Sequence, residues 1–442
     1  MKTTLFPHFF TGFLLVCSSV VALFGQPATQ LPSNTELVQP IRKASFNNQG
    51  ECPERRQGGN PRMLNGYQVF SGSMDGNRQV DPQIAVGGNY VMEASNSGLL
   101  IFTKDGTFVQ GVSQKCFNQG IDPKLFFDLH NRRFVFDLWW YYDAAKRKPV
   151  NIAVSETDDP TGAWNIYPVS RTEEVDGGGL GYSKKWIAYS YPGGEENTFV
   201  MKTEELNAGK PATVFHFKGS LGHPVWVQDD IEDLYFFDIE DEGNFTIRKV
   251  SADKAGNPVC TVVSRKPHGL AYIDYPPVSA QKGTDQKVSS GDRNPKNLVF
   301  QNGCIWFSQA VLCEGRSAVQ WHQVRAKDGK IIQTGLLRSS ESNFIQTTIA
   351  VNAKEDVLVG FQEVNEQSFI SPRFAFRKGG DKKGTLRPMV SLGEGKGATD
   401  GTSWGDYSGS IVDGDNLKDL WTIQSIANEK GRGETVIARV PF

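Results

Sequence analysis

The feature of this sequence that most constrains its fold is a strand–turn–strand unit that recurs along the chain. The clearest copy runs from Asp81 to Val86, turns at 87–89 and continues from Tyr90 to Ala94. Short β-branched and aromatic runs separated by Gly, Asn and Asp turns predict antiparallel strands. A repeat of roughly 40 to 60 residues built from strand pairs is typical of the blades of a β-propeller. Copies of the unit open at Asp81, Asp122, Lys185, His223, Asn297, Thr348 and Ser410.

We therefore expect an all-β fold, a β-propeller with seven blades. Six or eight blades stay open because the third and fourth copies are degenerate, and a pair of β-sandwiches is the alternative outside this class. Blades cannot bury their faces alone, so they stack radially and the terminal strands must close the ring. Tyr67–Phe70 and Thr435–Ala438 are the candidate N- and C-terminal strands of a mixed last blade.

The segments before the repeats differ in composition. Residues 1–25 combine Lys2 with an apolar run, Thr11–Phe24, that is too short to span a bilayer comfortably, which predicts an export signal peptide. Residues 26–62 are polar, contain Pro and lack periodicity, so we expect a linker or a loosely attached arm. Residues 63–442 are expected to form a single propeller domain. The predicted location is the periplasm, the cell surface or the extracellular space, with no membrane span after signal removal.

Charge and cysteine content restrict the partners and the cross-links. Lys and Arg number 47 against 49 Asp and Glu, so no basic surface argues for nucleic acid or for an anionic membrane. We expect a monomer. The five cysteines beyond the signal leave the pairing open: Cys304 and Cys313 are close enough in sequence to bridge two strands of one hairpin, and Cys52 could join Cys116.

The innermost strands of a propeller run roughly along the central axis, so residues at one end of each strand converge on a shared funnel. Like charges held a few ångströms apart raise one pKa and keep the others ionised, and paired carboxylates suit cleavage of glycosidic bonds. We assign Asp406, Asp81 and Asp122 as the candidate acid and base residues. The alternative is structural, since Asp-Pro at the start of a strand commonly caps a turn. The convergent residues are Asp81, Asp122, His223, Asp292, Arg293, Gln346, Asp406 and Tyr407.

Two glycine-containing strings add candidates for substrate binding. In 404–409, Trp404 could offer a flat face to a sugar ring and Tyr407 could orient the substrate; alternatively, Trp404 covers the core while the glycines allow close strand packing. In 291–294, Arg293 could clamp a substrate carboxylate or could pair with Asp292. The candidate substrate-binding residues are Tyr407, Arg293, Asp292, Trp404, His223 and Gln346.

Motifs of metal and cofactor enzymes are absent from the sequence. There is no His-Glu-x-x-His, no phosphate loop and no paired cysteine spacing of a zinc site. We expect no cofactor and no catalytic metal. A structural calcium ion is the open alternative, although no contiguous calcium-binding loop is present.

The chain resembles a family of exported bacterial proteins of uncharacterised function that are predicted to form sialidase-like propellers. The resemblance covers most of residues 78–442 and implies a six-bladed ring as the alternative to seven blades. The chain departs from the family pattern at 181–184, where Gly replaces the usual Asp of Asp-Tyr-Pro-Lys, and 155–164 only loosely matches a sialidase aspartate box. The motifs that carry the resemblance are 81–87 with 96–98, 122–125, 154–164, 292–293, 316–321 and 404–409.

Two functional hypotheses follow from these residues. The first is a secreted, carbohydrate-active protein that handles an extracellular glycan or polysaccharide in the funnel, as a hydrolase or a lyase. The second is a non-catalytic binding or scaffolding propeller at the cell surface, whose loops meet the partner. Both hypotheses are kept, because a fold alone does not imply a function.

Overall fold

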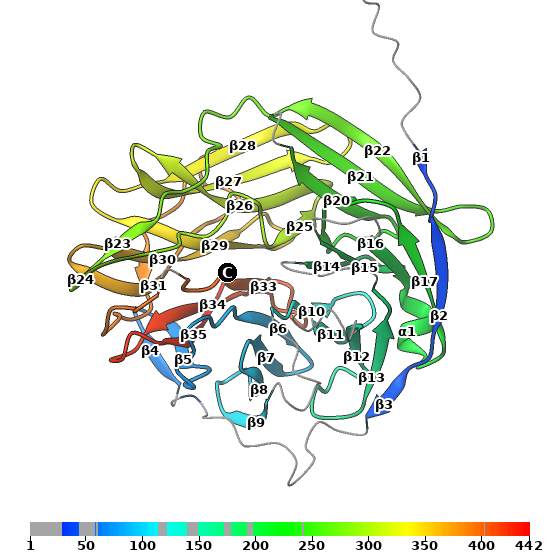
Figure 1. Cartoon of the computed structure of the whole chain (residues 1–442), viewed down its shortest axis with the longest axis horizontal. Helices are drawn as coiled ribbons and strands as arrows, with labels where there is room; N and C mark the ends of the chain where they lie inside the picture. Colours follow the sequence, from blue (N-terminus) through cyan, green and yellow to red (C-terminus); the bar gives the residue numbers. More distant parts are fainter. Residues whose placement is uncertain are drawn as a thin grey trace, which may run out of the picture.

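The strand–turn–strand units form antiparallel sheets that fan out around a central axis (Figure 1). The computed structural model describes residues 29–43, 58, 61–113, 122–138, 149–171, 178–191, 198–240, 243–401 and 403–442. Each strand pairs with the next along the chain, because short turns can join antiparallel neighbours. One short helix, α1 (Thr203–Asn207), occurs in these ranges. The expected all-β propeller is confirmed, whereas the predicted signal peptide, 1–25, lies outside the described residues.

Five of the sheets in the described ranges are separate blades of four or five strands. Each blade contains an antiparallel meander that begins with the innermost strand. The first two blades contain β6 (Gln83–Gly87), β7 (Tyr90–Ser95), β8 (Gly98–Thr103) and β9 (Phe108–Ser113), then β10 (Leu125–Asp128), β11 (Arg133–Leu138), β12 (Val150–Ser155) and β13 (Trp164–Val169). The other three contain β18 (His223–Pro224), β20 (Leu234–Ile239), β21 (Asn244–Ala252) and β22 (Pro258–Pro267), then β29 (Asn343–Val351), β30 (Val357–Asn365), β31 (Ser368–Arg377) and β32 (Val390–Ser391), then β33 (Gly409–Val412), β34 (Leu420–Ala427) and β35 (Gly433–Val440).

A ten-stranded sheet holds two further meanders, which are fused through β19 (Trp226–Val227). β19 pairs in parallel with β14 at Tyr182 and with β25 at Val299 and Phe300. The expectation of seven, or six, separate blades is therefore wrong: five blades are separate, because hydrogen bonds between innermost strands fuse the remaining meanders. The fused meanders are β14 (Gly179–Tyr182), β15 (Trp186–Ser190), β16 (Thr198–Lys202) and β17 (Ala212–Phe217), and β25 (Leu298–Gln301), β26 (Cys304–Cys313), β27 (Arg316–Arg325) and β28 (Lys330–Leu337). A small hairpin pairs β23 (Ser279–Gln281) with β24 (Thr284–Val288).

The turns that follow the innermost strands share a left-handed backbone residue. Asn89, Asn302 and Glu355 have φ values of 69°, 53° and 60° in these turns. Such a residue reverses the chain within a few positions, and neighbouring carboxylates bind the freed N–H groups. Asp229, for example, accepts hydrogen bonds from the backbone N–H groups of Asn302 and Gly303 at 2.8 and 2.9 Å. These turns fix one end of each innermost strand, and the predicted site residues lie at the other end.

The N-terminal arm is attached by backbone pairing along the outside of two separate blades and of the ten-stranded sheet. β1 (Thr29–Gln30), β2 (Asn34–Val38) and β3 (Ile41–Lys43) pair with β22, β17 and β13, and Figure 1 shows them as a blue strip along the rim. Val38 is the large hydrophobic residue that this segment buries. Because main-chain bonds attach the arm, its sequence lacks the periodicity of a buried strand, which is why the sequence suggested a linker or a loose attachment.

The last blade combines strands from both ends of the domain. β5 (Tyr67–Ser71) pairs with β35, and β4 (Arg62–Leu64) pairs with β5. Val69 and Phe70 of β5 are fully buried there. A segment from the start of the domain therefore completes the sheet formed by its final strands.

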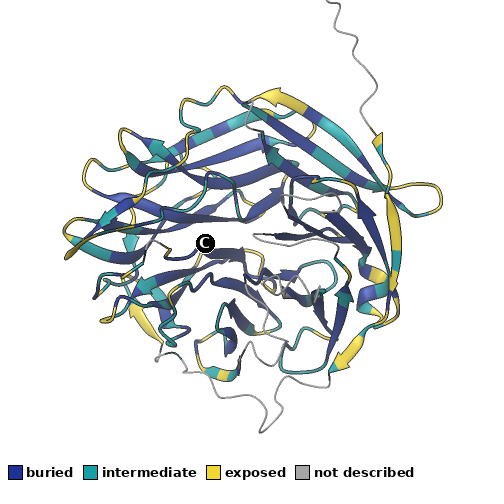
Figure 2. Ribbon diagram, in the orientation of Figure 1, coloured by how far each residue is buried: buried dark blue, intermediate teal, exposed yellow. Residues whose placement is uncertain are grey.

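Most of the residues in the strands are buried, as the dark blue ribbons of Figure 2 show, and many of them are apolar. Cys304 and Cys313 are the first and last residues of β26, which places them roughly 30 Å apart at the rise of an extended strand. The hairpin disulfide between them is therefore wrong, and both are buried free thiols, as is Cys260. Cys52 and Cys116 lie outside the described residues. Among those residues, no helix is long and apolar enough to cross a membrane.

Candidate active site at the funnel

Three carboxylates from three sheets meet at one end of the innermost strands. Asp81 precedes β6, Asp122 precedes β10 and Asp406 precedes β33. One carboxylate oxygen of each lies within 4.8 Å of the other two. Asp81 and Asp122 are buried, with 1% and 9% of their surface exposed, whereas Asp406 is exposed. The structure thus brings together the three residues that the sequence predicts as acid and base candidates, and only one of them faces solvent.

Hydrogen bonds from other segments hold this cluster in place. Asp406 donates its backbone N–H to Asp81 Oδ1, and Asn96 donates from Nδ2 to Asp81 Oδ2 at 2.7 Å. Asn96 Oδ1 in turn accepts the backbone N–H of Asp122 at 2.7 Å. A side chain at Gly405 would place its Cβ 2.6 Å from Asp81 Oδ1, so the close approach requires glycine. The described contacts of the Asp81 carboxylate are thus with distant segments, unlike the local turn capping that was the structural alternative.

The backbone is strained at the same end of the strands. Asp81, Asp122 and Gln346 have φ values of 46°, 51° and 48°, in the left-handed region. Asp81 and Asp122 also precede prolines, and a proline disfavours helical conformations in the residue before it. Such conformations cost about 1–3 kcal/mol each and persist where surrounding contacts over-determine them, most often at functional sites.

Burial and like charge dominate the electrostatics of Asp81. Burial, followed by the neighbouring carboxylates of Asp122 and Asp406, raises the pKa of Asp81 to about 7. The backbone N–H of Asp406 and the ammonium of Lys124 oppose the rise in this pKa. Asp81 therefore changes protonation near neutral pH, next to a carboxylate that solvent reaches.

Lys124 and Tyr407 lie beneath the cluster. The Lys124 side chain is 3% exposed, and its Nζ lies 3.3 Å from the centroid of the Tyr407 ring. Burial lowers the pKa of Lys124 to about 8, against the attraction of Asp122 and Asp137. Tyr407 donates its hydroxyl to the Pro123 carbonyl at 3.2 Å and is 2% exposed. Tyr407 is therefore part of the support of the cluster and offers no surface that could orient a substrate.

A cavity of about 610 Å³ adjoins the exposed member of the cluster. It reaches four of the predicted site residues, Asp406, His223, Asp292 and Arg293, but neither Asp81 nor Asp122. The other lining residues are Ser190, Tyr191, Ser220, Gly222, Asp238, Ile239, Glu240, Tyr275, Asn294 and Lys296. We refer to this cavity as the funnel pocket.

The funnel pocket combines acidic, basic and neutral polar groups. Burial and the ammonium groups of Lys296 and Lys124 lower the pKa of His223 to about 4, so its imidazole is neutral at pH 7. Lys296 Nζ lies 3.5 Å from an Asp292 carboxylate oxygen. The Arg293 guanidinium lies 4.5 Å from the centroid of the Tyr275 ring, which is 56% exposed. Tyr275 is thus the aromatic face that this pocket presents to a ligand.

Trp404 and Gln346 do not line the funnel pocket. The Trp404 indole is fully buried and donates its Nε1–H to Gln362 Oε1 at 3.0 Å, so it packs in the core and cannot stack on a sugar. Gln346 is 3% exposed and donates from Nε2 to the Gly405 carbonyl. Both residues therefore support the segment that carries Asp406.

Sequence reasoning missed several residues of this site. Asn96 follows β7 and Lys124 follows the Asp122-Pro123 pair, so the repeat pattern could have identified both as residues near the funnel. Tyr191, Tyr275 and Lys296 lie in segments where the repeat is degenerate or interrupted, and the sequence carries no signal for them.

Asp81, Asp122 and Asp406 form the acidic cluster. Among the His, Cys, Asp and Glu side chains that the structure describes, these three lie close enough together to share a cation. Carboxylate oxygens suit hard cations such as Ca²⁺, which takes six to eight oxygen ligands. Both oxygens of Asp81 already accept N–H hydrogen bonds, and Lys124 supplies a positive charge beside the cluster. We therefore do not assign these residues as metal ligands.

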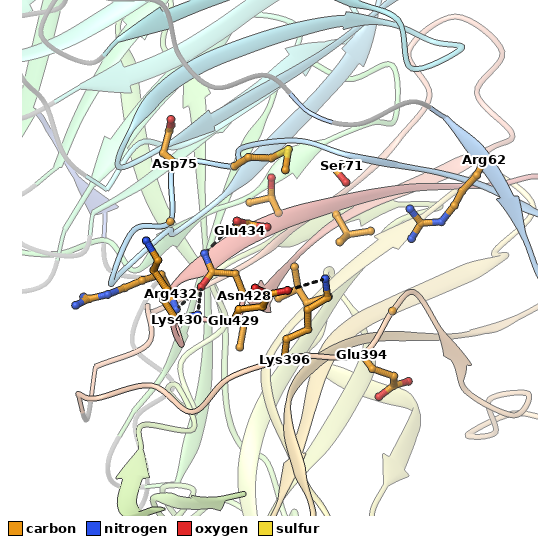
Figure 3. Close-up of a pocket in the computed structure, with 17 residues that line it drawn as sticks. Arg62, Ser71, Asp75, Glu394, Lys396, Asn428, Glu429, Lys430, Arg432 and Glu434 are labelled. Atoms are coloured by element: carbon orange, nitrogen blue, oxygen red, sulfur yellow. Dashed lines mark hydrogen bonds and ion pairs between the residues drawn. The ribbon is translucent and has the colours of Figure 1, made fainter. Parts of the chain in front are cut away.

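A second cavity, of about 910 Å³, lies beside the last blade, away from the predicted site residues. Figure 3 shows charged side chains of both signs around it. Lys396 lies 3.9 Å from Glu429, and Asn428 donates to Glu434 at 3.0 Å, so these three charged side chains have partners within the cavity wall.

Comparisons with known proteins show likenesses in fold alone. No family model and no curated protein sequence matches this chain. A protein of unknown function from Dyadobacter fermentans is 9% identical with a TM-score of 0.36, over 88% of this chain and 98% of that chain. The α-L-arabinanase of Penicillium chrysogenum complexed with arabinobiose is 8% identical with a TM-score of 0.36, over 92% and 98%. A subtype N10 neuraminidase-like protein of A/little yellow-shouldered bat/Guatemala is 8% identical with a TM-score of 0.35, over 85% and 98%.

Proposed function

We propose that this protein is an exported propeller that binds an extracellular glycan in the funnel pocket and cleaves it with Asp406. The observation that carries the proposal is the meeting of three carboxylates from separate sheets at the edge of a cavity, with the exposed one, Asp406, reaching into it. A site of this kind can hold one carboxyl protonated while a neighbour stays ionised, which glycosidic bond cleavage requires.

The burial pattern divides the roles. Asp406 and Asp292 are the predicted carboxylates that line the pocket, so they are the groups that a substrate would touch. Asp81 accepts the Asp406 backbone N–H and Asp122 lies within 4.8 Å of both, so these two position Asp406. His223 is a neutral imidazole at pH 7 and can accept a proton in an elimination, the reaction of a lyase. Arg293 and Tyr275 would hold the sugar.

The test is a screen of extracellular glycans for new reducing ends and for unsaturated products, with wild type and Asp406→Asn in parallel. Asp285→Asn is the matched control, since Asp285 is exposed on the β23–β24 hairpin. We expect Asp406→Asn to lower cleavage by about 10²–10⁴-fold, the usual contribution of a general acid or base, and Asp285→Asn to leave it unchanged. Undiminished cleavage by Asp406→Asn would remove Asp406 from the reaction.

The second candidate function is glycan binding without cleavage. It is favoured by the burial of Asp81 and Asp122, because both lie outside the cavity, so Asp406 is the one member of the three-carboxylate cluster that lines it. Calorimetric titration with the same glycans separates the two functions. Binding with no product from any bound glycan would assign the protein to this second class.

A further inference from the structure

Lys124 is a buried lysine whose ammonium group is held by electrostatic contacts rather than by hydrogen bonds. Its side chain is 3% exposed, and its Nζ has no hydrogen-bond partner among the described residues. Burying an ammonium is costly unless opposite charges compensate for the lost water. The Tyr407 ring, whose centroid lies 3.3 Å from Nζ, offers a cation–π attraction, and the opposite charges come from neighbouring carboxylates.

The groups that face Lys124 come from six segments and include three carboxylates. Asp122 precedes it in its own segment, and Asp137 of β11 accepts the Lys124 backbone N–H. Of the facing carboxylates, Asp122 exerts the largest effect on the Lys124 ammonium. The full set is Asp122, Asp137, Asp81 before β6, Tyr407 before β33, Lys296 before β25 and His223 of β18. Asp406 lies next to this set, against Asp81.

Removing the Lys124 charge would leave the Asp81, Asp122 and Asp406 carboxylates with Lys296 as the cation of this set. Three carboxylates within 4.8 Å of one another repel strongly, and two of them are shielded from water. The position of Lys124, in direct sequence after Asp122-Pro123, ties the compensating charge to the same strained segment that places Asp122.

We propose that Lys124 is a positioning residue of the funnel site, whose buried ammonium is the counter-charge that keeps the Asp81, Asp122 and Asp406 carboxylates together. The role in catalysis rests on the proposed function, whereas the charge coupling does not. Lys124 thereby sets the pH range in which Asp406 has ionised neighbours. The alternative role, packing on Tyr407 alone, would make Lys124 indifferent to those carboxylates.

A double-mutant cycle tests the coupling without any glycan. Lys124→Met keeps the apolar stem and removes the charge, Asp122→Asn removes one facing carboxylate, and the double variant removes both. We expect the single variants to destabilise and the double variant to recover, with a coupling of at least about tenfold in the folding equilibrium constant measured by urea unfolding. A coupling below tenfold overturns the proposal. The double variant has balanced charges, so it stays measurable by its own unfolding, and its failure to fold would count against the proposal.

The pH dependence of unfolding provides the second readout. We expect the carboxyl titration, seen as a change of stability with pH, to move up by about one pH unit or more in Lys124→Met, because a neighbouring cation favours the ionised carboxylate. Lys282→Met is the matched control: Lys282 also lies over an aromatic ring, that of Phe369 at 5.2 Å, but on the surface. An unshifted profile in Lys124→Met overturns the proposal. If the protein cleaves a glycan, the pH profile of that cleavage should shift in the same direction in Lys124→Met. If it cleaves none, the unfolding data still decide the role of Lys124.

Discussion

Trp404→Phe tests whether the residue before Gly405 is a core anchor or a ligand platform. The indole is fully buried among Val288, Ile345, Val364 and Ile370 and donates to Gln362 Oε1. Phe lacks the N–H, which leaves a buried acceptor unsatisfied at a cost of about 1–3 kcal/mol. It also has three fewer heavy atoms, which at about 0.8 kcal/mol each removes roughly 2 kcal/mol of burial. We expect a loss of about 3–5 kcal/mol in the free energy of unfolding.

Urea unfolding followed by far-ultraviolet circular dichroism measures this loss without relying on tryptophan emission. Tyr275→Phe is the comparison, since Tyr275 is 56% exposed and its substitution should change the free energy of unfolding by less than about 0.5 kcal/mol. A Trp404→Phe variant that loses less than about 1 kcal/mol, a typical cost of any single substitution, would refute the assignment of Trp404 to the core. A selective loss of glycan binding with unchanged stability would restore the platform interpretation.

Two further predictions concern the acidic cluster. Because burial raises the pKa of Asp81 from 3.8 to about 7, its ionisation opposes folding, and wild type should lose stability relative to Asp81→Asn as the pH rises from about 4 to about 7; unfolding of both proteins across this range checks it, and parallel curves would contradict it. Because Lys124 and two N–H donors already serve the cluster, addition of Ca²⁺ or of a chelator should leave the melting temperature unchanged, and a rise of several degrees with Ca²⁺ would instead support a structural calcium ion.

The convergence of the funnel carboxylates was predictable because it depends on the repeat. Asp81 and Asp122 occupy the same position before their strands, so any closed ring of blades brings them to one end of the axis. Asp406 carries no Asp-Pro signature, yet its place before β33 follows from the same register. Sequence periodicity therefore located the cluster, but it carried no information on which carboxylates solvent would reach.

Features that depend on pairing between neighbouring blades were not predictable in this way. The fusion depends on β19, whose two residues, Trp226 and Val227, pair with β14 on one side and with β25 on the other. Nothing in these two residues distinguishes this double pairing from that of an ordinary strand. The sequence suggested that Cys304 and Cys313 lie on two strands of one hairpin, with a turn between them. In the structure a single strand, β26, begins at Cys304 and ends at Cys313. Burial along β26 is nearly continuous, so the strand lacks the alternation of buried and exposed residues from which its length could be predicted.

The pairing of β5 with β35 has a consequence for the order in which the chain can fold. β1, β2 and β3 find their partners only after much of the chain has followed, and β5, although it can pair with β4 at once, must wait for the final residues to pair with β35. Until then Phe70 has its contact with Phe102 but lacks the one with Trp421, and such long-range pairing slows folding. Early termination of translation, or proteolysis near residue 433, would remove β35 and leave β5 without its partner. The unpaired strand edges could then pair with other chains and would be accessible to a quality-control protease.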